Sequence, residues 1–367
     1  MKESIQIKHI QNADELETLQ TPWNHLMQES GIKDVFLTWE WLSAWWKEYG
    51  LDKELWLVTA WKSDELVGVA PLMLENKRKS GLPVRILKTL GTPESDVGGF
   101  LVRDGNGEIL EVIWDYILRE ARQWDGIHLK EFCYDAHQTR HILEIFKKYG
   151  LCSLIKVKEH YYIPVQGTWD EFIKSLSKNT RKGLNRRMRR AEEYGKVSLE
   201  RNQGPYIEWK HFEQLFGINQ TGNYPNLYNM DQEQRFHREL MERMQSKDWM
   251  NIDFLYIDNK PVAFQYGFFF DNRYEDWRGG FDKSYHELSV GKLLLNLSIE
   301  QLFQNGFKEH DFLRGTYDYK SIWNSKSRSF INIRAAFPNN INAIIAFIFL
   351  PKIKRLLKSI LRKFKGN

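Results

Sequence analysis

The chain has 367 residues, of which 42% are hydrophobic and 28% are charged, so it is expected to fold throughout, and its length predicts two domains. The formal net charge is +5, yet residues 335–367 alone carry seven Lys or Arg and no acid. The basic charge therefore belongs to the C-terminal tail. This excludes a uniformly basic surface of the kind that nucleic-acid-binding proteins present.

The two cysteines, Cys133 and Cys152, have no metal-ligand spacing around them, which argues against a zinc site and a disulfide scaffold. Residues 1–20 contain no hydrophobic signal core. Together these features predict a protein of the reducing cytoplasm, without a metal.

Residues 36–46 predict a helix that begins at Thr38 and places Trp41, Trp45 and Trp46 on one apolar face, where core packing is favoured over ligand stacking. A turn-rich loop over 91–99, which contains Asp96, follows three predicted strands. The elements predicted for this half are the strands 55–61, 66–74, 85–90, 126–131 and 153–157, and the helices 108–124 and 137–149.

The second half begins with a helix near residue 169 and a basic helix over 178–190, where seven of thirteen residues are Lys or Arg. Such a run is typical of a solvated helix face, or of a helix that recognises phosphate through residues near its start. Those residues are Asn179, Arg181, Lys182 and Arg186. The elements that follow are the helices 209–217, 232–245 and 290–305, and the strands 252–257, 262–270, 273–280, 310–313 and 330–337.

The order strand, acidic turn, strand occurs at 55–74 and again at 253–270, which indicates a divergent internal duplication. The predicted domains are residues 1–165 and residues 166–338, the second with a basic linker helix at 170–195. A basic amphipathic tail occupies 339–367.

Two stretches of the second half carry candidate chemistry. The strand ending at Leu313 leads through Arg314 and Gly315 to Lys320, which is either a point charge against an oxyanion or phosphate, or a solvated lysine in a surface turn. A glycine, Gly291, follows Ser289 at the start of a helix. Backbone N–H groups there suit a pyrophosphate, although Ser289 could also be an ordinary N-cap.

The order of elements resembles the GNAT superfamily of acyl-CoA N-acyltransferases. In the pyrophosphate turn of that family Gly291 matches, whereas His286 and Ser289 depart from the usual pattern. The whole chain is similar to the CelD-like branch, associated with cellulose and other envelope polysaccharides, which in turn resembles Fem-type peptidoglycan transferases. The matching pieces are Thr38-Trp39-Glu40-Trp41-Leu42, Gly68-Val69-Ala70-Pro71-Leu72, Asp96, Asn179 with Arg181, Ser289-Val290-Gly291, Asp311-Phe312-Leu313 with Gly315, and Tyr319-Lys320 with Trp323.

The resemblance implies an α/β protein with mixed α+β sheets, arranged as two tandem GNAT-like domains. It implies an acyl-CoA co-substrate, acetyl-CoA first among them. The residues expected to hold that co-substrate are His286, Ser289, Val290, Gly291 and Lys292. The acceptor is expected to be an amino group of a sugar or of an envelope precursor, free or lipid-linked, held by Asp96, Asn179, Arg181, Arg186, Arg314 and Tyr317.

Acyl transfer to an amine requires a neutral amine, a stabilised oxyanion and a protonated leaving group. We assign Lys320 to the oxyanion or an acceptor phosphate, and Tyr319 or Tyr317 to the leaving sulfur. Asp311 and Asp96 are candidate bases or amine anchors, and Asp311 could equally fix the loop by hydrogen bonds.

Two alternative functions stay open. A Fem-type enzyme would take its acyl group from aminoacyl-tRNA, and the basic helix 178–190 would then face RNA; no other nucleic acid is expected to bind. A non-catalytic GNAT-shaped scaffold would bind a ligand or partner only.

The tail predicts a membrane contact. Residues 341–350 are an apolar run too short to span a bilayer. After Pro351, six apolar residues share one helical face and the other positions are basic, which is typical of a helix lying on the anionic inner face of a membrane. Packing of this helix on the protein itself is the alternative.

Overall fold

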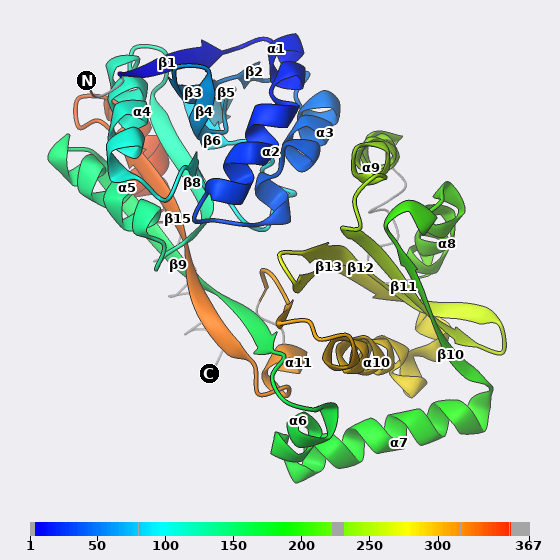
Figure 1. Cartoon of the computed structure of the whole chain (residues 1–367). Coiled ribbons are helices and arrows are strands. Elements are labelled where there is room, and N and C mark those ends of the chain that lie inside the picture. Colours follow the sequence, from blue (N-terminus) through cyan, green and yellow to red (C-terminus); the bar gives the residue numbers. More distant parts are fainter. Residues whose placement is uncertain (1–3, 80, 222–230, 316–317, 352, 354–367) are drawn as a thin grey trace. The chain divides into compact units, whose positions relative to one another are not determined.

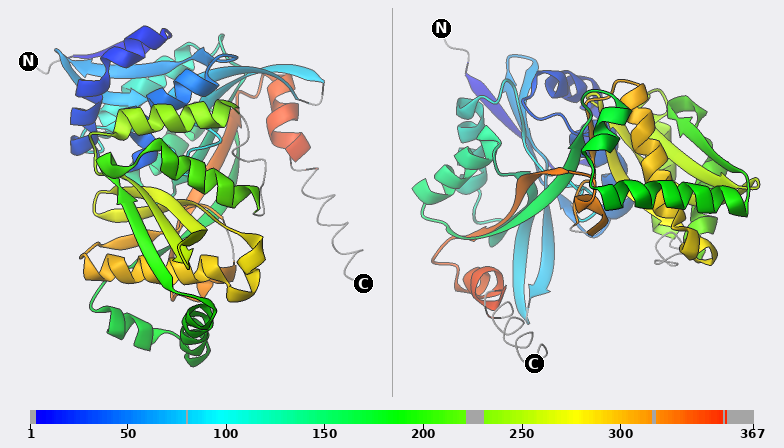
Figure 2. Two further views of the ribbon diagram at one scale, coloured as in Figure 1. Left: turned by 90° about the vertical axis from the view of Figure 1, so that its right-hand side faces the viewer. Right: turned by 90° about the horizontal axis from the view of Figure 1, so that it is seen from below.

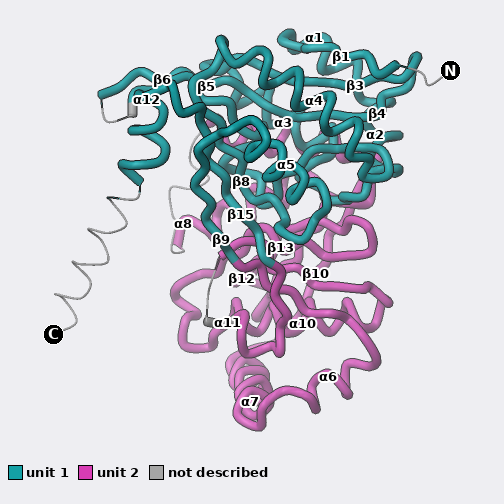
Figure 3. Tube along the Cα trace, turned by 90° about the vertical axis from the view of Figure 1, so that its left-hand side faces the viewer, with its two compact units in different colours: residues 1–158, 329–367 teal, residues 159–328 magenta. Residues whose placement is uncertain are grey.

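The computed structural model describes residues 4–79, 81–221, 231–315, 318–351 and 353. It divides the chain into two compact units (Figure 3), residues 1–158 with 329–367 as unit 1, and residues 159–328 as unit 2. The division falls inside two long strands. The chain leaves unit 1 along β9 (Cys152–Pro164) and returns to it along β15 (Lys326–Ala336).

This division differs from the predicted domains in two respects, since unit 2 begins at residue 159 and not at 166, and it ends at residue 328 and not at 338. The strand predicted at 330–337 was assigned to the second domain, but its residues from Ser329 onward belong to unit 1. There β15 pairs with a strand of unit 1, through Ile331 opposite Phe132 and Ala335 opposite Ile127.

Unit 1 contains a four-stranded sheet in the order β1-β3-β4-β7, and its other strands form the order β15-β8-β6-β5-β2 (Figure 1). Strands β6 and β8 are parallel and are connected through helix α4. The strands are β1 (Ile5–Ile10), β2 (Glu54–Leu55), β3 (Leu57–Lys62), β4 (Glu65–Ala70), β5 (Leu72–Lys79), β6 (Leu82–Thr89), β7 (Leu101–Val102) and β8 (Gly126–Cys133). The helices are α1 (Ala13–Thr18), α2 (Gln20–Glu29), η1 (Val35–Leu37), α3 (Trp39–Tyr49), α4 (Gly107–Arg119), α5 (His137–Lys148), α12 (Ile341–Ile344) and the π-helical turn η4 (Ile345–Phe349).

Helix α3 begins where the sequence predicted, because the Thr38 side chain accepts a hydrogen bond from the backbone N–H of Trp41. Trp41 and Trp45 are no more than 1% exposed, which confirms that they pack in the core. Each indole still donates a hydrogen bond to the loop 91–99: Trp41 Nε1 to Ser95 Oγ at 2.8 Å, and Trp45 Nε1 to Glu94 at 2.6 Å. The helix thus holds that loop in place.

Unit 2 contains strands in the order β10-β11-β12-β13-β14-β9. Helix α10 packs on one face of β11–β13, while α8 packs against β12 and β13 from the other face (Figures 1 and 2). The strands are β10 (Val197–Gln203), β11 (Met250–Ile257), β12 (Lys260–Phe270), β13 (Arg273–Phe281) and β14 (Glu309–Asp311). The helices are α6 (Trp169–Ser175), α7 (Lys178–Tyr194), η2 (Gly204–Tyr206), α8 (Trp209–Gln220), α9 (Asp231–Met244), η3 (Lys283–Leu288), α10 (Val290–Gln304) and α11 (Asp318–Ser321).

Two tight turns set the register of β11, β12 and β13. Asp258 and Asn259 have φ values of 47° and 64°, and Asp271 and Asn272 have 47° and 61°. Two successive residues with positive φ match the twist of antiparallel strands, and Asp and Asn tolerate that conformation better than most residues. The turns predicted at both places are confirmed.

The two units repeat one plan. In unit 1, β6 is followed by α4 and by the parallel strand β8, and in unit 2, β13 is followed by α10 and by the parallel strand β14. Within the described ranges, no helix has both the length and the apolar character needed to cross a membrane. The predicted tail helix after Ile353 lies outside the described residues.

Candidate active site

The parallel strands β13 and β14 pair over only three residues and then separate. Their pairs are Arg273 with Glu309, Tyr274 with His310, and Glu275 with Asp311. Strand β13 continues to Phe281, whereas the chain after Asp311 leaves the sheet. A shift of register on the other edge of β13 makes Trp277 the extra residue of a β-bulge. Bulges are frequent beside active sites, because they redirect the side chains around them.

Polar side chains cross the sheet at this point, on the face that α10 covers. Asp253 of β11 receives two hydrogen bonds from Arg201 at 2.9 and 2.7 Å and one from Ser298 of α10 at 2.9 Å. On β12, Gln265 pairs with Asp253 in the sheet, and its Nε2 donates to Asp276 of β13 at 2.8 Å. These polar side chains occupy inward-facing positions of the sheet, where Val or Ile is more usual.

Asp276 is the most perturbed acid of this row. Burial raises the pKa of its carboxyl to about 7; the hydrogen bond from Gln265 and the charge of Lys320 oppose that rise without cancelling it. The side chain is still 11% exposed. A carboxyl with a pKa near neutrality can exchange a proton at physiological pH, as a general base must.

His310 of β14 lies beside Asp276. The side chain is fully buried, and its Nε2 is 3.8 Å from the Asp276 carboxylate. Burial lowers the pKa of His310 to about 3, so the ring is neutral at physiological pH. Neither ring nitrogen makes a hydrogen bond within the described structure, and the ring packs against Tyr274 and Phe312.

The predicted catalytic residue Lys320 is 2% exposed, so the alternative of a solvated lysine in a surface turn is wrong. Its Nζ donates to the carbonyl oxygens of Phe312 at 2.8 Å, Leu313 at 3.4 Å and Arg314 at 3.1 Å. An ammonium group has three donors, and these contacts use all three. Lys320 therefore holds the chain that leaves β14, and its predicted role at an oxyanion stays a prediction.

Asp311 is 4% exposed and is engaged in the same loop. Its Oδ1 accepts the backbone N–H of Leu313 at 2.7 Å, while Oδ2 lies 3.2 Å from the guanidinium of Arg328. These bonds match the loop-fixing role that we kept as the alternative to catalysis. Leu313 has a φ of 53°, a conformation that a branched side chain rarely adopts without such support.

Three of the predicted catalytic or acceptor residues, Lys320, Asp311 and Arg314, thus lie in one connected stretch, from the end of β14 to helix α11. Tyr317 lies outside the described residues. Tyr319 belongs to helix α11, but its side chain also lies outside what the structure describes. Their proposed roles stay predictions.

The predicted cofactor turn precedes α10. His286 is part of η3, and its carbonyl accepts the N–H of Ser289 at 3.0 Å. Ser289 has a left-handed conformation, and its side chain makes no capping hydrogen bond, so the ordinary N-cap alternative is wrong. The backbone N–H of Lys292 already donates to the carbonyl oxygen of Ser289 at 2.9 Å. The N–H groups of Val290 and Gly291 precede the first hydrogen bonds of the helix, as at every helix start. The Val290 side chain is buried, so only its backbone is available to a ligand.

Helix α7 carries the predicted residues Asn179, Arg181 and Arg186. Its Ser177 N-cap accepts the backbone N–H of Thr180 at 3.1 Å. The helix buries Leu184 and Ala191, and Ala191 packs in the cluster that includes Leu288 and Val290, so α7 lies against the start of α10. The exposed side chains of α7 include Lys178, Asn179, Lys182, Arg186, Arg189 and Arg190, whereas Arg181 is half-buried.

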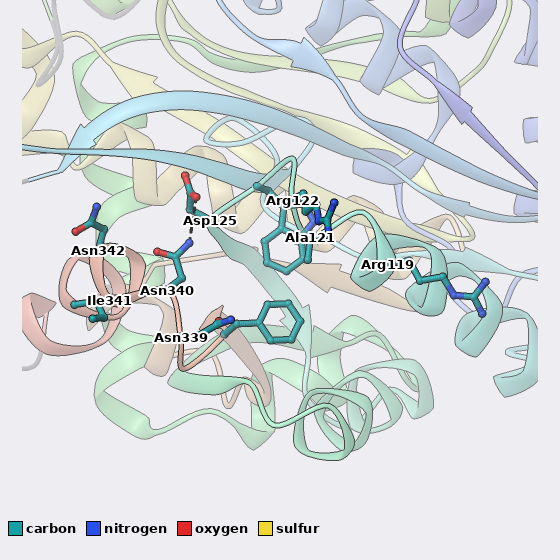
Figure 4. A pocket seen from close by; sticks show the side chains of 10 residues that line it. Arg119, Ala121, Arg122, Asp125, Asn339, Asn340, Ile341 and Asn342 are labelled. Atoms are coloured by element: carbon teal, nitrogen blue, oxygen red, sulfur yellow. Dashed lines mark hydrogen bonds between the residues drawn. The ribbon is translucent and has the colours of Figure 1, made fainter.

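Asp96 belongs to unit 1, where it is 4% exposed within the loop 91–99. A pocket of about 640 Å³ also lies in unit 1, but its walls come from 119–125 and 337–342 (Figure 4) and contain none of the predicted site residues. Among the described residues, no group of three or more His, Cys, Asp or Glu is arranged to hold a metal ion.

Sequence reasoning missed Gln265, Asp276 and His310. The sequence signal was clear only for Gln265, which interrupts the apolar and aromatic run Ala263–Phe270, whereas Asp276 and His310 lie in strands that contain other charged residues. A polar residue at the centre of a buried strand needs a partner. That requirement marks Gln265 as a candidate, and its partner Asp276 is identified only once the pairing of the strands is known.

Comparison with known proteins identifies part of this chain. Residues 178–321 match the family model described as an acetyltransferase (GNAT) domain. No curated protein matches the sequence. Similar solved structures exist at low identity. One is FemX, with a TM-score of 0.58 at 11% identity, covering 89% of this chain and 96% of that one.

A tandem GNAT protein from the clavulanic acid biosynthesis pathway has a TM-score of 0.51 at 11% identity, covering 91% of this chain and 99% of that one. A conserved protein of unknown function from Bacteroides thetaiotaomicron has the same score and identity, covering 91% and 100%. These similarities confirm the predicted fold class of mixed α/β structure with two GNAT-like domains. Residues 178–321 therefore match a GNAT domain, within a chain that has the fold of tandem GNAT proteins.

Proposed function

We propose that this protein is an N-acyltransferase in which Asp276 is the general base. The observation that carries the proposal is a carboxyl group whose pKa is raised to about 7 at the point where β13 and β14 separate, inside the GNAT domain. An attacking amine must be neutral, and an acceptor ammonium must lose a proton before or during attack. Asp276 accepts that proton.

The reaction balances with these groups. The amine nitrogen forms a bond to the acyl carbon, and the bond from that carbon to the donor's sulfur or oxygen breaks. The proton of the amine moves to Asp276, and the leaving thiolate or alkoxide takes up a proton, for which Tyr319 or Tyr317 remain our candidate donors. Neutral His310 contributes no positive charge, so it leaves the pKa of Asp276 high.

The donor has two candidates. Acyl-CoA, with acetyl-CoA first, is supported by the description of the matching family model and by the turn that contains Gly291. Aminoacyl-tRNA, as in a Fem-type transferase, is supported by the fold shared with FemX and by the exposed basic residues of α7. Lys178, Lys182 and Arg186 follow one another at intervals of four, on one helix face, which suits a phosphate backbone.

Aminoacyl-tRNA is the better supported of the two. The turn before α10 departs from the acyl-CoA pattern at His286 and Ser289, and the residues that lead into it form the 3-10 helix η3. The acceptor that we propose, under either donor, is an amine of a sugar or envelope precursor, as the resemblance to the CelD-like and Fem-type proteins implies.

The test supplies the purified chain with charged tRNA or with a panel of acyl-CoAs, together with amino sugars and envelope precursors, and detects the amide by mass spectrometry. Asp276→Asn should lower turnover by about two orders of magnitude or more, on the scale of a lost general base. The rate of the native protein should rise with pH to a plateau, with an inflection near 7, and the inflection should vanish in the variant. Asp282→Asn, which changes another carboxylate of the same region, is the control.

The donor is decided by a second pair of variants. Replacing Lys182, Arg186 and Arg190 with Gln should raise the KM for charged tRNA and leave the KM for acyl-CoA unchanged. A control that removes the same charge from other exposed positions of unit 2, Lys174, Lys210 and Lys308, should leave both unchanged. Ligand binding without amide formation under every condition would favour the non-catalytic scaffold.

A further inference from the structure

The C-terminal part of unit 1 that the structure describes is helical and apolar on two faces. The inner face of α12 and η4 is buried: Ala343, Ala346, Phe347 and Ile348 pack in a cluster with Val84 and Ile86 of β6. Asn340 fixes the start of the helix, since its side chain accepts the N–H of Ala343 at 3.1 Å and donates to Asp125 at 3.1 Å. The segment is therefore already docked on its own domain through one face.

The opposite face is also apolar and lies open. Ile341 is 68% exposed, Ile345 38%, Phe349 55% and Ile353 49%. We call these four residues the outer stripe. They follow one another at intervals of four, as neighbours on a helix surface do. Of the eleven large hydrophobic side chains that are exposed among the described residues, these four are the largest group within one short segment. A helix that is apolar all round is normally covered on both sides.

Basic side chains line two pockets next to this segment. Ile341 also lines the pocket of Figure 4, to which Arg119 and Arg122 contribute. On the neighbouring hairpin of β5 and β6, Lys77 and Arg78 line a second pocket together with Val84, against which the inner face packs. The one carboxylate shared by both pockets, Asp125, is 3.4 Å from Arg85 and is thus already paired.

The sequence extends this charge. From Lys352 to the end of the chain there are seven Lys or Arg and no Asp or Glu. An apolar stripe that runs into a purely basic segment is the composition of a helix that lies in a lipid interface. It does not suit nucleic acid, which offers an exposed apolar stripe nothing to bury against, and two copies of the segment would repel each other by their like charges.

We propose that the outer stripe docks unit 1 on an anionic lipid surface. The four apolar side chains enter the boundary between headgroups and acyl chains, and the basic residues that follow bind the lipid phosphates and carboxylates. The inner face stays on β6, so the attachment requires no rearrangement of the domain. The proposal does not depend on the acyltransferase function, but a lipid-linked acceptor would be presented at the same surface.

The test is cosedimentation of the full chain with vesicles of phosphatidylcholine and phosphatidylserine, beside vesicles of phosphatidylcholine alone. We expect binding to the mixed vesicles at low salt, release at high salt, and little binding to phosphatidylcholine alone. The double variant Ile345→Ser with Phe349→Ser should weaken binding by about tenfold or more, because two side chains no longer enter the lipid. Lys352→Gln with Arg355→Gln and Lys358→Gln should lower binding and its salt dependence.

The matched control is Leu51→Ser with Val157→Ser, which removes two exposed apolar side chains of unit 1 outside the outer stripe and should leave binding unchanged. Melting temperature and sedimentation velocity accompany each variant. Vesicle binding that survives in the stripe variant would overturn the proposal. A marked fall in its melting temperature would also do so, by showing that the stripe packs on the protein, as would a native dimer that the stripe variant converts to monomer.

Discussion

At the level of single residues, burial sets the chemistry of Asp276 more than any neighbour does. Lys320 and Gln265 both favour its ionised form, yet the pKa remains near 7 because the carboxylate loses its hydration. Burial also lowers the pKa of His310, so its ring stays neutral. The net charge of Asp276 and His310 together is therefore zero or minus one. Near neutral pH the site therefore gains or loses one proton, at Asp276.

This shift makes the stability of the protein depend on pH. The pKa of Asp276 is higher in the folded state than its ordinary value of 3.8, so its contribution is fully present below about pH 4 and is lost as the pH rises through about 7. Asp276→Asn removes the cost of a buried charge. We expect the variant to unfold at a higher temperature than the native protein at pH 8, with a gain in the free energy of unfolding of up to about 4 kcal/mol.

At pH 4 the two proteins should be about equally stable. The carboxyl of Asp276 is then neutral in the folded native protein, just as the Asn side chain is in the variant. Denaturant titrations at the two pH values measure the difference. A gain that is the same at both would show that the Asn side chain packs better and that no buried charge is involved.

The residues of this site were only partly predictable. Asp311 was found because it lies in the short strand that ends at Leu313, and Lys320 because it lies among the aromatic residues that follow this strand, a pattern that is local in the sequence. The contact between Asp276 and His310 depends on the parallel pairing of β13 and β14, which are joined through all of α10. No local pattern fixes that register, so the most perturbed acid was missed.

At the level of elements, most helices and strands of both units could be predicted, because their apolar periodicity and turn residues agree. Helix α4, for example, places Ile109, Ile113 and Ile117 on one face, and all three are buried. The first elements, β1 to α2, were missed. Their apolar residues are sparse: the burial of β1 alternates along the strand, and only Leu16 is buried in α1.

The loop after β14 is held largely by one side chain, that of Lys320. Lys320 satisfies three carbonyl groups in a stretch that contains Leu313 at positive φ. Lys320→Met keeps most of the apolar stem but leaves buried carbonyls without a donor, which costs about 1–3 kcal/mol for each group that water does not reach. We expect a lower melting temperature and faster amide exchange or proteolysis at 311–321.

Lys308→Met, at an exposed position of the same unit, is the control and should change neither quantity. If Lys320→Met keeps the native melting temperature and loses only turnover, the ammonium serves the reaction and not the loop, and the oxyanion role predicted from the sequence would stand.

At the level of the whole molecule, the sequence did not predict that the chain returns from unit 2 to complete unit 1. Each domain was predicted as one continuous segment, but unit 1 is completed by residues from 329 onward. A strand such as β15 has the same composition whichever sheet it joins, so its partner is decided by pairing over long sequence distances.

The boundary at the start of unit 2 can be tested directly. Residues 159–164 lie before the domain start predicted at 166, yet Tyr162, Ile163 and Pro164 pair with all three residues of β14. Ile163 is fully buried in the cluster around Phe312 and Trp323, and the carbonyl oxygen of Tyr161 accepts the backbone N–H of Phe312 at 2.9 Å. Without this strand, β14 is an edge strand of three residues, and His310 loses its pairing partner Ile163.

We therefore expect a fragment of residues 166–328 to be much less stable than one of residues 159–328. Burying Ile163 alone contributes about 1.5–3 kcal/mol, and the lost pairing of β14 adds to that. The two fragments share every other residue, so the comparison isolates the strand. Thermal unfolding followed by circular dichroism should give a lower midpoint and a broader transition for the shorter fragment, whose exposed β14 should also promote aggregation. Equal midpoints would place the domain boundary where the sequence predicted it, after β9, and would show that β14 needs no partner on this side.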